Sequence, residues 1–122
     1  MFAMLAFLWY VAPTPLAPSP PSVPFDRTML TSFYGDGFHG RLTASGTRFD
    51  KHAMTVAHKK LPFGTRLRLT YPWTGKTVDV TVTDRGPYIG ERELDVSEGV
   101  ARSLGFTERG VVHLWVTELG AD

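Results

Sequence analysis

The sequence predicts a mainly β fold, a small barrel of about six short strands with one short helix. Two segments, Thr65–Tyr71 and Lys76–Asp84, alternate apolar and polar residues, which is the pattern of a strand with one buried face. The residues between them, 72–75, read Pro-Trp-Thr-Gly and suit a hairpin turn. Glycines and prolines punctuate most of the remaining chain, which indicates tight turns between short strands.

The individual elements follow from their local patterns. The expected strands are, in order, Thr28–Tyr34, Ala53–Ala57, Thr65–Tyr71, Lys76–Asp84 and Gly110–Leu119. Only Ser97–Leu104 has helical spacing, because Val96, Val100 and Leu104 fall on one face. Ser97 is suited to cap the start of this helix, and Gly105 is suited to end it.

The chain divides into an N-terminal segment, residues 1–26, and one domain, residues 27–122. The first charged residue is Asp26, and Phe2–Ala12 is an uninterrupted apolar run followed by six prolines. This run is shorter than the roughly 20 residues that span a bilayer, so no integral membrane span is expected. It resembles the apolar part of a secretory signal, without a basic start, and a stiff proline-rich linker follows it. We therefore expect export to the periplasm or cell envelope, with an interfacial anchor or a start codon placed upstream of the domain as alternatives.

Composition excludes several classes of function. There is no cysteine, which removes disulfides, thiolate catalysis and cysteine-based zinc sites. The net charge is +1 and no block of Lys or Arg occurs, so no nucleic-acid partner is expected. His39, His52 and His113 have no ligand-like spacing, so neither a metal nor another cofactor is expected. A monomer is the expected state.

Asp84 is the first candidate for catalysis. It follows Val78, Val80 and Val82 in phase, so the alternation places its carboxyl on the apolar face of the strand. A carboxyl in such a setting holds its proton more tightly, which suits a general acid. The alternative is a structural Asp that bonds the following turn or pairs with Arg85. His58, beside Lys59 and at the end of a short strand, is the second candidate, although a lone His is more often structural.

Two further acidic residues have structural alternatives. Asp50 lies in a loop rich in Gly, Ser and Thr and is equally suited to capping a turn. Asp95 precedes the predicted helix, where a capping role is the default expectation.

Four motifs in order resemble the rare lipoprotein A family. The first, residues 32–50, contains Ser-Phe-Tyr-Gly, then Ala-Ser-Gly, then Phe-Asp. The second, residues 54–65, reads Met-Thr-Val-Ala-His-Lys-Lys-Leu-Pro-Phe-Gly-Thr. The third is Thr-Asp-Arg-Gly-Pro-Tyr at residues 83–88, and the fourth is Leu-Asp-Val-Ser at residues 94–97. The resemblance covers about Leu30 to Leu119. It implies a double-psi β-barrel of six strands and a role in the bacterial cell wall as a lytic transglycosylase. The partner would be peptidoglycan glycan strands stripped of their peptides.

The same resemblance implies which residues carry the chemistry. The family's functional positions correspond to Asp84 and His58, and a third family position, a Glu, is Thr47 here. Asp50 is retained and is a possible electrostatic substitute for that Glu. The family's lipid-anchoring cysteine is absent.

These positions together give a hypothesis for the reaction. Asp84 would donate its proton to the glycosidic oxygen between MurNAc and GlcNAc, and the C6 hydroxyl of the sugar would attack to give a 1,6-anhydro product. The conjugate base of Asp84, or His58, would take up the C6 hydroxyl proton.

Binding of the glycan is expected to use polar and aromatic side chains near this acid. Tyr34, Lys59 and Arg85 would bind sugar hydroxyls and the lactyl carboxylate, with Tyr88 and Trp73 as flat faces for sugar rings.

Three alternatives stay open at this point. One is a water-using glycoside hydrolase with Asp50 as second carboxylate. The second is a non-catalytic glycan-binding module similar to expansins. The third is a protein-interaction domain.

Overall fold

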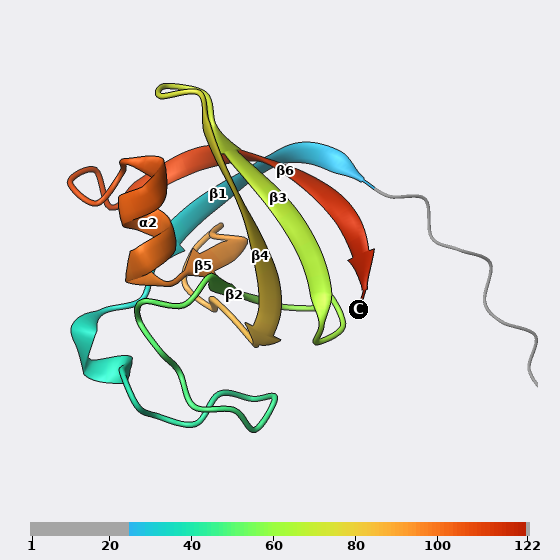
Figure 1. Ribbon diagram of the computed structural model, residues 1–122, viewed down its shortest axis with the longest axis vertical. Helices are drawn as coiled ribbons and strands as arrows, with labels where there is room; N and C mark the ends of the chain where they lie inside the picture. Colours follow the sequence, from blue (N-terminus) through green and yellow to red (C-terminus); the bar gives the residue numbers. More distant parts are fainter. Residues whose placement is uncertain (1–24, 122) are drawn as a thin grey trace, which may run out of the picture.

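The computed structural model describes residues 25–121, in which the chain forms a closed barrel with one helix (Figure 1). The elements are β1 (Asp26–Phe33), η1 (Asp36–Phe38), β2 (Thr55–His58), β3 (Thr65–Tyr71), β4 (Lys76–Asp84), β5 (Leu94–Val96), α2 (Glu98–Leu104) and β6 (Val111–Ala121). The predicted barrel of six strands with one short helix is confirmed. The signal-like run and nearly all of the linker predicted for residues 1–26 lie outside the described residues.

The strands pair around the barrel in the order β1-β5-β2-β4-β3-β6, and β6 closes it by pairing with β1. Two of these pairings, β1 with β5 and β2 with β4, are parallel, and the others are antiparallel. Closure leaves no free sheet edge. The parallel pairings also bring together segments that are far apart in the sequence, which is how the candidate site forms.

The barrel interior is the hydrophobic core. Its largest fully buried side chains include Met29, Leu67, Leu69, Val80, Val82 and Phe106. Helix α2 adds Val100, Ala101 and Leu104 to the same cluster. Ser97 caps the helix by accepting a hydrogen bond from the backbone N–H of Val100, and Gly105 ends it in the left-handed conformation, both as predicted. No helix within residues 25–121 is long and apolar enough to cross a membrane.

Two elements were not predicted. The 3-10 turn η1 and the strand β5 are each three residues long, too short for periodicity to reveal. The second strand also begins at Thr55 rather than at residue 53, and β1 begins at Asp26. Between η1 and β2 the chain makes a long excursion, drawn in cyan and green in Figure 1, that lies below the barrel near the arrowhead of β4.

Candidate active site

A bulge at the end of β4 decides where Asp84 lies. Val56 of β2 pairs with Val82, but the next residue, Ala57, pairs with Asp84, so one residue of β4 is skipped. Because paired residues share a face, Asp84 lies on the face of Ala57 and not on the core face of Val82. The prediction that Asp84 continues the valine face is therefore wrong, since strict alternation does not allow for a bulge.

Asp84 is nevertheless only partly exposed, because a loop and an aromatic residue cover it. Its Oδ1 accepts hydrogen bonds from the backbone N–H groups of Ala44 and Arg85, at 2.8 and 2.9 Å. Its Oδ2 accepts a hydrogen bond from the hydroxyl of Tyr34 at 2.7 Å. Three donors therefore converge on the two oxygens, an arrangement that suits a carboxylate acting as a hydrogen-bond acceptor.

A second carboxyl, that of Asp95, belongs to the same row of paired residues across the barrel strands. Asp95 of β5 pairs with Ala57 on one side and with Ser32 of β1 on the other, so the row runs Ser32, Asp95, Ala57, Asp84 across four strands. The two aspartates are two strands apart, which at the usual strand spacing separates their Cα atoms by roughly 10 Å. Ala57 lies between them in this row.

The surroundings of Asp95 differ from those of Asp84. Its Oδ1 accepts one hydrogen bond, from the Ser32 hydroxyl at 3.2 Å. Burial, the largest cause, raises the pKa of Asp95 from 3.8 to about 6, and the neighbouring charge of Asp84 adds to the increase. Asp95 therefore holds a proton at higher pH than an ordinary aspartate. The predicted helix-capping role of Asp95 is wrong, because Ser97 is the cap.

Both carboxyls line one open cleft of about 370 Å³. Its other walls come from the segment after β1, the excursion and the start of the β4–β5 loop, and the lining residues are Tyr34, Phe38, Arg41, Leu42, Asp84, Arg85, Gly86, Pro87, Tyr88, Ile89 and Asp95. Four large apolar or aromatic side chains of the cleft are exposed to solvent: Phe38 (48%), Leu42 (64%), Tyr88 (73%) and Ile89 (64%). The cleft thus combines two acids with flat apolar surfaces, which is the composition of a sugar-binding groove.

Tyr34 forms the floor beside Asp84. Its ring stacks on Phe49, with centroids 4.3 Å apart, and both pack with Ala57 in a small second cluster. Burial, and next the hydrogen bond to Asp84, raise the pKa of Tyr34, so the phenol stays neutral and its hydroxyl proton stays available to Asp84.

Thr47, at the position of the family's Glu, belongs to the loop that covers Asp84. The hydroxyls of Thr43, Ser45 and Thr47 lie 3.0 to 3.1 Å from one another. The same loop donates the Ala44 N–H to Asp84 and the Ser45 N–H to the Thr83 carbonyl. Thr47 therefore contributes to holding the loop in place and brings no charge to the cleft.

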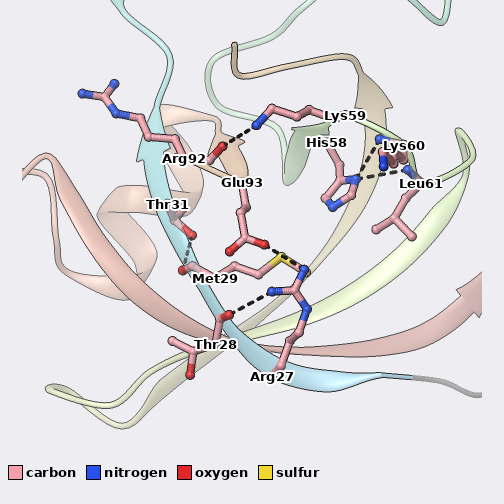
Figure 2. Close-up of polar contacts among 10 residues, drawn as sticks. All are labelled: Arg27, Thr28, Met29, Thr31, His58, Lys59, Lys60, Leu61, Arg92 and Glu93. Carbon is pink, nitrogen blue, oxygen red and sulfur yellow. Dashed lines mark hydrogen bonds and ion pairs between the residues drawn. The ribbon is translucent and has the colours of Figure 1, made fainter. Parts of the chain in front are cut away.

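His58 and Lys59 lie in a different pocket. His58 follows Ala57 in β2, so its side chain points to the opposite face of the sheet, and its strand partner is the core residue Leu94. It lines a pocket of about 220 Å³ with Arg27, Lys59, Lys60 and Glu93. Figure 2 shows these side chains and the hydrogen bonds and ion pair among them. The predicted catalytic role of His58 stays a prediction, and the structure does not bring it into the cleft with Asp84.

The remaining predicted residues divide between the cleft and other places. Arg85 and Tyr88 line the cleft, but the Arg85 guanidinium lies over the Phe63 ring at 4.0 Å. None of the ion pairs found within residues 25–121 involves Asp84, so the predicted pair with Arg85 is not observed. The other predicted structural role, a hydrogen bond to the following turn, is observed, because the Arg85 N–H donates to Asp84. Asp50 accepts a hydrogen bond from the His52 N–H, as a turn-capping residue does. Trp73 is in the β3–β4 hairpin against Arg109, at the other end of β4.

No three histidine or acidic side chains among the described residues gather in a way that would hold a metal ion. The ionisable and polar side chains that line the cleft are the two carboxyls, the phenols of Tyr34 and Tyr88, and the guanidinium groups of Arg41 and Arg85.

A family model described as lytic transglycolase matches residues 27–116. The chain belongs to this lytic transglycolase family. The resemblance to rare lipoprotein A proteins is confirmed, and with it the double-psi β-barrel.

Curated relatives share between 44% and 50% of their residues with the chain over the matched region. A "Probable endolytic peptidoglycan transglycosylase RlpA" of Synechocystis is 50% identical over 82 residues, 67% of this chain and 26% of the relative. The "Endolytic peptidoglycan transglycosylase RlpA" of Neisseria meningitidis is 44% identical over 95 residues, 78% of this chain and 40% of the relative. That of Pseudomonas aeruginosa is 44% identical over 85 residues, 70% of this chain and 25% of the relative. The chain thus spans well under half the length of these lytic transglycolase relatives.

Solved structures share the fold at lower identity. A Streptomyces papain inhibitor matches with a TM-score of 0.60 at 24% identity, over 77% of this chain and 93% of that one. The apo expansin of Clavibacter michiganensis matches with a TM-score of 0.62 at 23% identity, over 78% of this chain and 50% of that one. These likenesses show the barrel fold alone, which the lytic transglycolase family therefore shares with proteins of other kinds.

Proposed function

We propose that this chain is an exported peptidoglycan lytic transglycosylase that acts in the periplasm or cell envelope. Its substrate would be the MurNAc–GlcNAc bond of denuded glycan strands, and its products would carry 1,6-anhydro ends. The observation that carries the proposal is the row that places Asp84 and Asp95 on one face, toward one cleft. Membership of the lytic transglycolase family, and relatives named as peptidoglycan transglycosylases, support the same reaction.

The two carboxyls differ in a way that suggests separate roles. Asp95, whose pKa is raised to about 6, has one hydrogen-bond donor and is the better proton donor. Asp84 accepts three hydrogen bonds and is the better acceptor. This division changes the hypothesis from sequence, in which Asp84 was the acid.

The proposed reaction proceeds without water. The bond between the anomeric carbon and the bridging oxygen breaks, and that oxygen takes the proton of Asp95. The C6 hydroxyl oxygen of the same sugar bonds to the anomeric carbon, and its proton passes to Asp84. The negative charge of the Asp84 carboxylate stabilises the oxocarbenium character that develops at the anomeric carbon between these two events.

The rim of the cleft supplies binding surface. The exposed Tyr88 and Phe38 offer flat faces to sugar rings, and the guanidinium groups of Arg41 and Arg85 offer donors to hydroxyl and carboxylate oxygens. These groups line the same cleft as the two aspartates, so a glycan strand bound by them would lie against the acids.

Mass spectrometry of denuded sacculi tests the proposal. The wild type should release anhydro-ended fragments, while Asp84→Asn and Asp95→Asn should each reduce release by a factor of about 100 or more, the usual cost of losing a general acid or base. Glu108→Gln is the matched control, because Glu108 is exposed and is not among the residues that line the cleft.

The products also separate the alternatives. Reducing ends in place of anhydro ends would identify a water-using hydrolase, for which carboxyls two strands apart leave room for a water molecule. Binding to sacculi with no products, equal in the wild type and both Asn variants, would identify an expansin-like binding module and refute the enzymatic proposal.

A further inference from the structure

The pocket that contains His58 is separate from the cleft and is not used by the proposed reaction. Arg27, His58, Lys59, Lys60 and Glu93 line it. The β4–β5 loop connects it to the cleft, because the start of this loop lines the cleft and its end, Glu93, lines the pocket. A group bound in the pocket would therefore touch the same loop that holds Tyr88 at the cleft.

Hydrogen bonds fix the orientation of the His58 ring. Its Nδ1 accepts the backbone N–H groups of Lys60 and Leu61, both at 3.0 Å. A neutral imidazole in this position carries its proton on Nε2, which then serves as a donor. In Figure 2 the second nitrogen of the ring is turned toward Arg27 and Glu93, so this donor faces the pocket.

The pocket carries more positive than negative charge. Arg27, Lys59 and Lys60 are cations, and Glu93 is the one acid that lines the pocket. Arg27 pairs with Glu93 at 2.7 Å, and Lys59 Nζ donates to the Arg92 carbonyl at 3.0 Å, which leaves further donors on both cations. Lys60 is exposed, and its Nζ appears in none of the ion pairs found within residues 25–121.

The cations around His58 all lower its pKa. Burial, the largest cause, and next Arg27 lower the pKa of His58, and Arg85 and Lys59 add to the decrease. Glu93 is the opposing group, and it raises the pKa of His58. Arg27 belongs to β1, Lys59 follows β2, Arg85 follows β4 and Glu93 precedes β5, so cations act on the ring from three of these four segments.

We propose that this pocket binds an oxyanion, the carboxylate of a sugar acid or a phosphate group, with the Nε2–H of His58, Arg27 and Lys60 as donors. A cavity lined by several donors and one acid, which is already paired, is complementary to a single anionic group. The choice of a sugar acid as the natural source rests on the proposed function, and the anion site itself does not.

Binding of an anion and protonation of His58 are coupled. An anion offsets the cations that lower the pKa of His58, so a bound anion raises that pKa. By reciprocity the anion binds more tightly as pH falls through the pKa of His58, by at most tenfold for each pH unit.

Side-chain ¹⁵N spectra of histidine test the site on the full chain. N-acetylmuramic acid and inorganic phosphate are the two anionic probes, and N-acetylglucosamine is the neutral match. We expect either or both anions to raise the pKa of His58, with His113 as an internal reference on the outer surface. A response to phosphate alone would assign a free-phosphate site, and a response to muramic acid would assign a sugar-acid site.

Two variants localise the binding. Lys60→Gln should weaken anion binding about two- to fivefold, the effect of one partly screened charge. Lys76→Gln, in the hairpin at the other end of β4, should leave it unchanged. Equal responses to N-acetylglucosamine and the anions, no response to any probe, or equal effects of both variants would overturn the proposal.

The result is independent of turnover. Asp84→Asn should bind the anions as the wild type does, since Asp84 lies on the opposite face of the sheet. A catalytically inactive protein whose His58 responds to the anions would refute the proposed function and leave the anion site standing. An active protein whose His58 responds to no probe would refute the anion site and leave the proposed function standing.

Discussion

Replacing Asp95 by Asn should stabilise the fold at neutral pH while it removes activity. The Asn side chain keeps an oxygen that can accept the Ser32 hydroxyl, but it has no charge to bury. In the folded chain Asp95 has a pKa of about 6, against 3.8 for an ordinary aspartate. The folded state therefore holds more protons than the unfolded state between pH 4 and 6, so the free energy of unfolding decreases as pH rises through this range.

The size of the effect follows from the same pKa values. One unit of pKa difference corresponds to about 1.36 kcal/mol. The difference between 3.8 and about 6 therefore sets an upper limit of about 3 kcal/mol on the gain in unfolding free energy. Asp95 lines an open cleft, so solvent screening reduces the expected gain to about 1–2 kcal/mol. For a domain of this size, that gain corresponds to an increase in Tm of roughly 5–10 °C.

Urea denaturation of wild type and Asp95→Asn from pH 3.5 to 8 measures this directly. The two proteins should have similar stability at pH 3.5, and the variant should become the more stable one by pH 7. Asp79→Asn is a matched control with the opposite sign, because the ion pair with Arg68 lowers the pKa of Asp79. A variant that is less stable than wild type at pH 7, or a difference that does not change with pH, would refute the reasoning.

Three other substitutions have definite expected outcomes. Tyr34→Phe removes the hydroxyl that donates to Asp84 and should cost about 1 kcal/mol in urea denaturation and lower the rate of anhydro-product release; unchanged values of both would contradict its role. Gly99→Ala should lower stability by about 1–3 kcal/mol in thermal melts, because its Cβ would lie 2.7 Å from the His52 carbonyl oxygen, and an unchanged Tm would argue against that contact. Thr47→Glu adds a carboxylate at the family's acidic position and should increase product release from sacculi, whereas a lower rate would indicate that the hydroxyl cluster matters more than charge.

The sequence predicted the barrel because its longer strands carry a strong pattern. Strands β3 and β4 alternate over seven and nine residues, and α2 has a cap, an apolar face and a terminal glycine. Strand β5 gives no such signal, because three residues contain too little of any period. Its identity depends on pairing with β1 and β2, which are separated from it by dozens of residues.

The candidate site was predicted only in part for the same reason. Asp84, Tyr34, Arg85 and Tyr88 were predicted and do line one cleft. Asp95 was missed as a site residue, although two signals were available: it is a polar residue between the apolar Leu94 and Val96, and it lies in the fourth motif of the family resemblance, residues 94–97. That His58 lies on the other face follows from its position next to Ala57, but only once β2 is known to be a strand there.

The bulge in β4 explains how one strand contributes both to the hydrophobic core and to the cleft. If β4 alternated without interruption, Asp84 would follow Val82 into the core, where an unpaired carboxylate is unstable. Skipping one residue moves Asp84 to the face of Ala57, where Tyr34 and two backbone N–H groups satisfy it beside open solvent. The valines before the bulge remain in the barrel interior. The strand therefore contributes to the core along most of its length and to the cleft at its last residue.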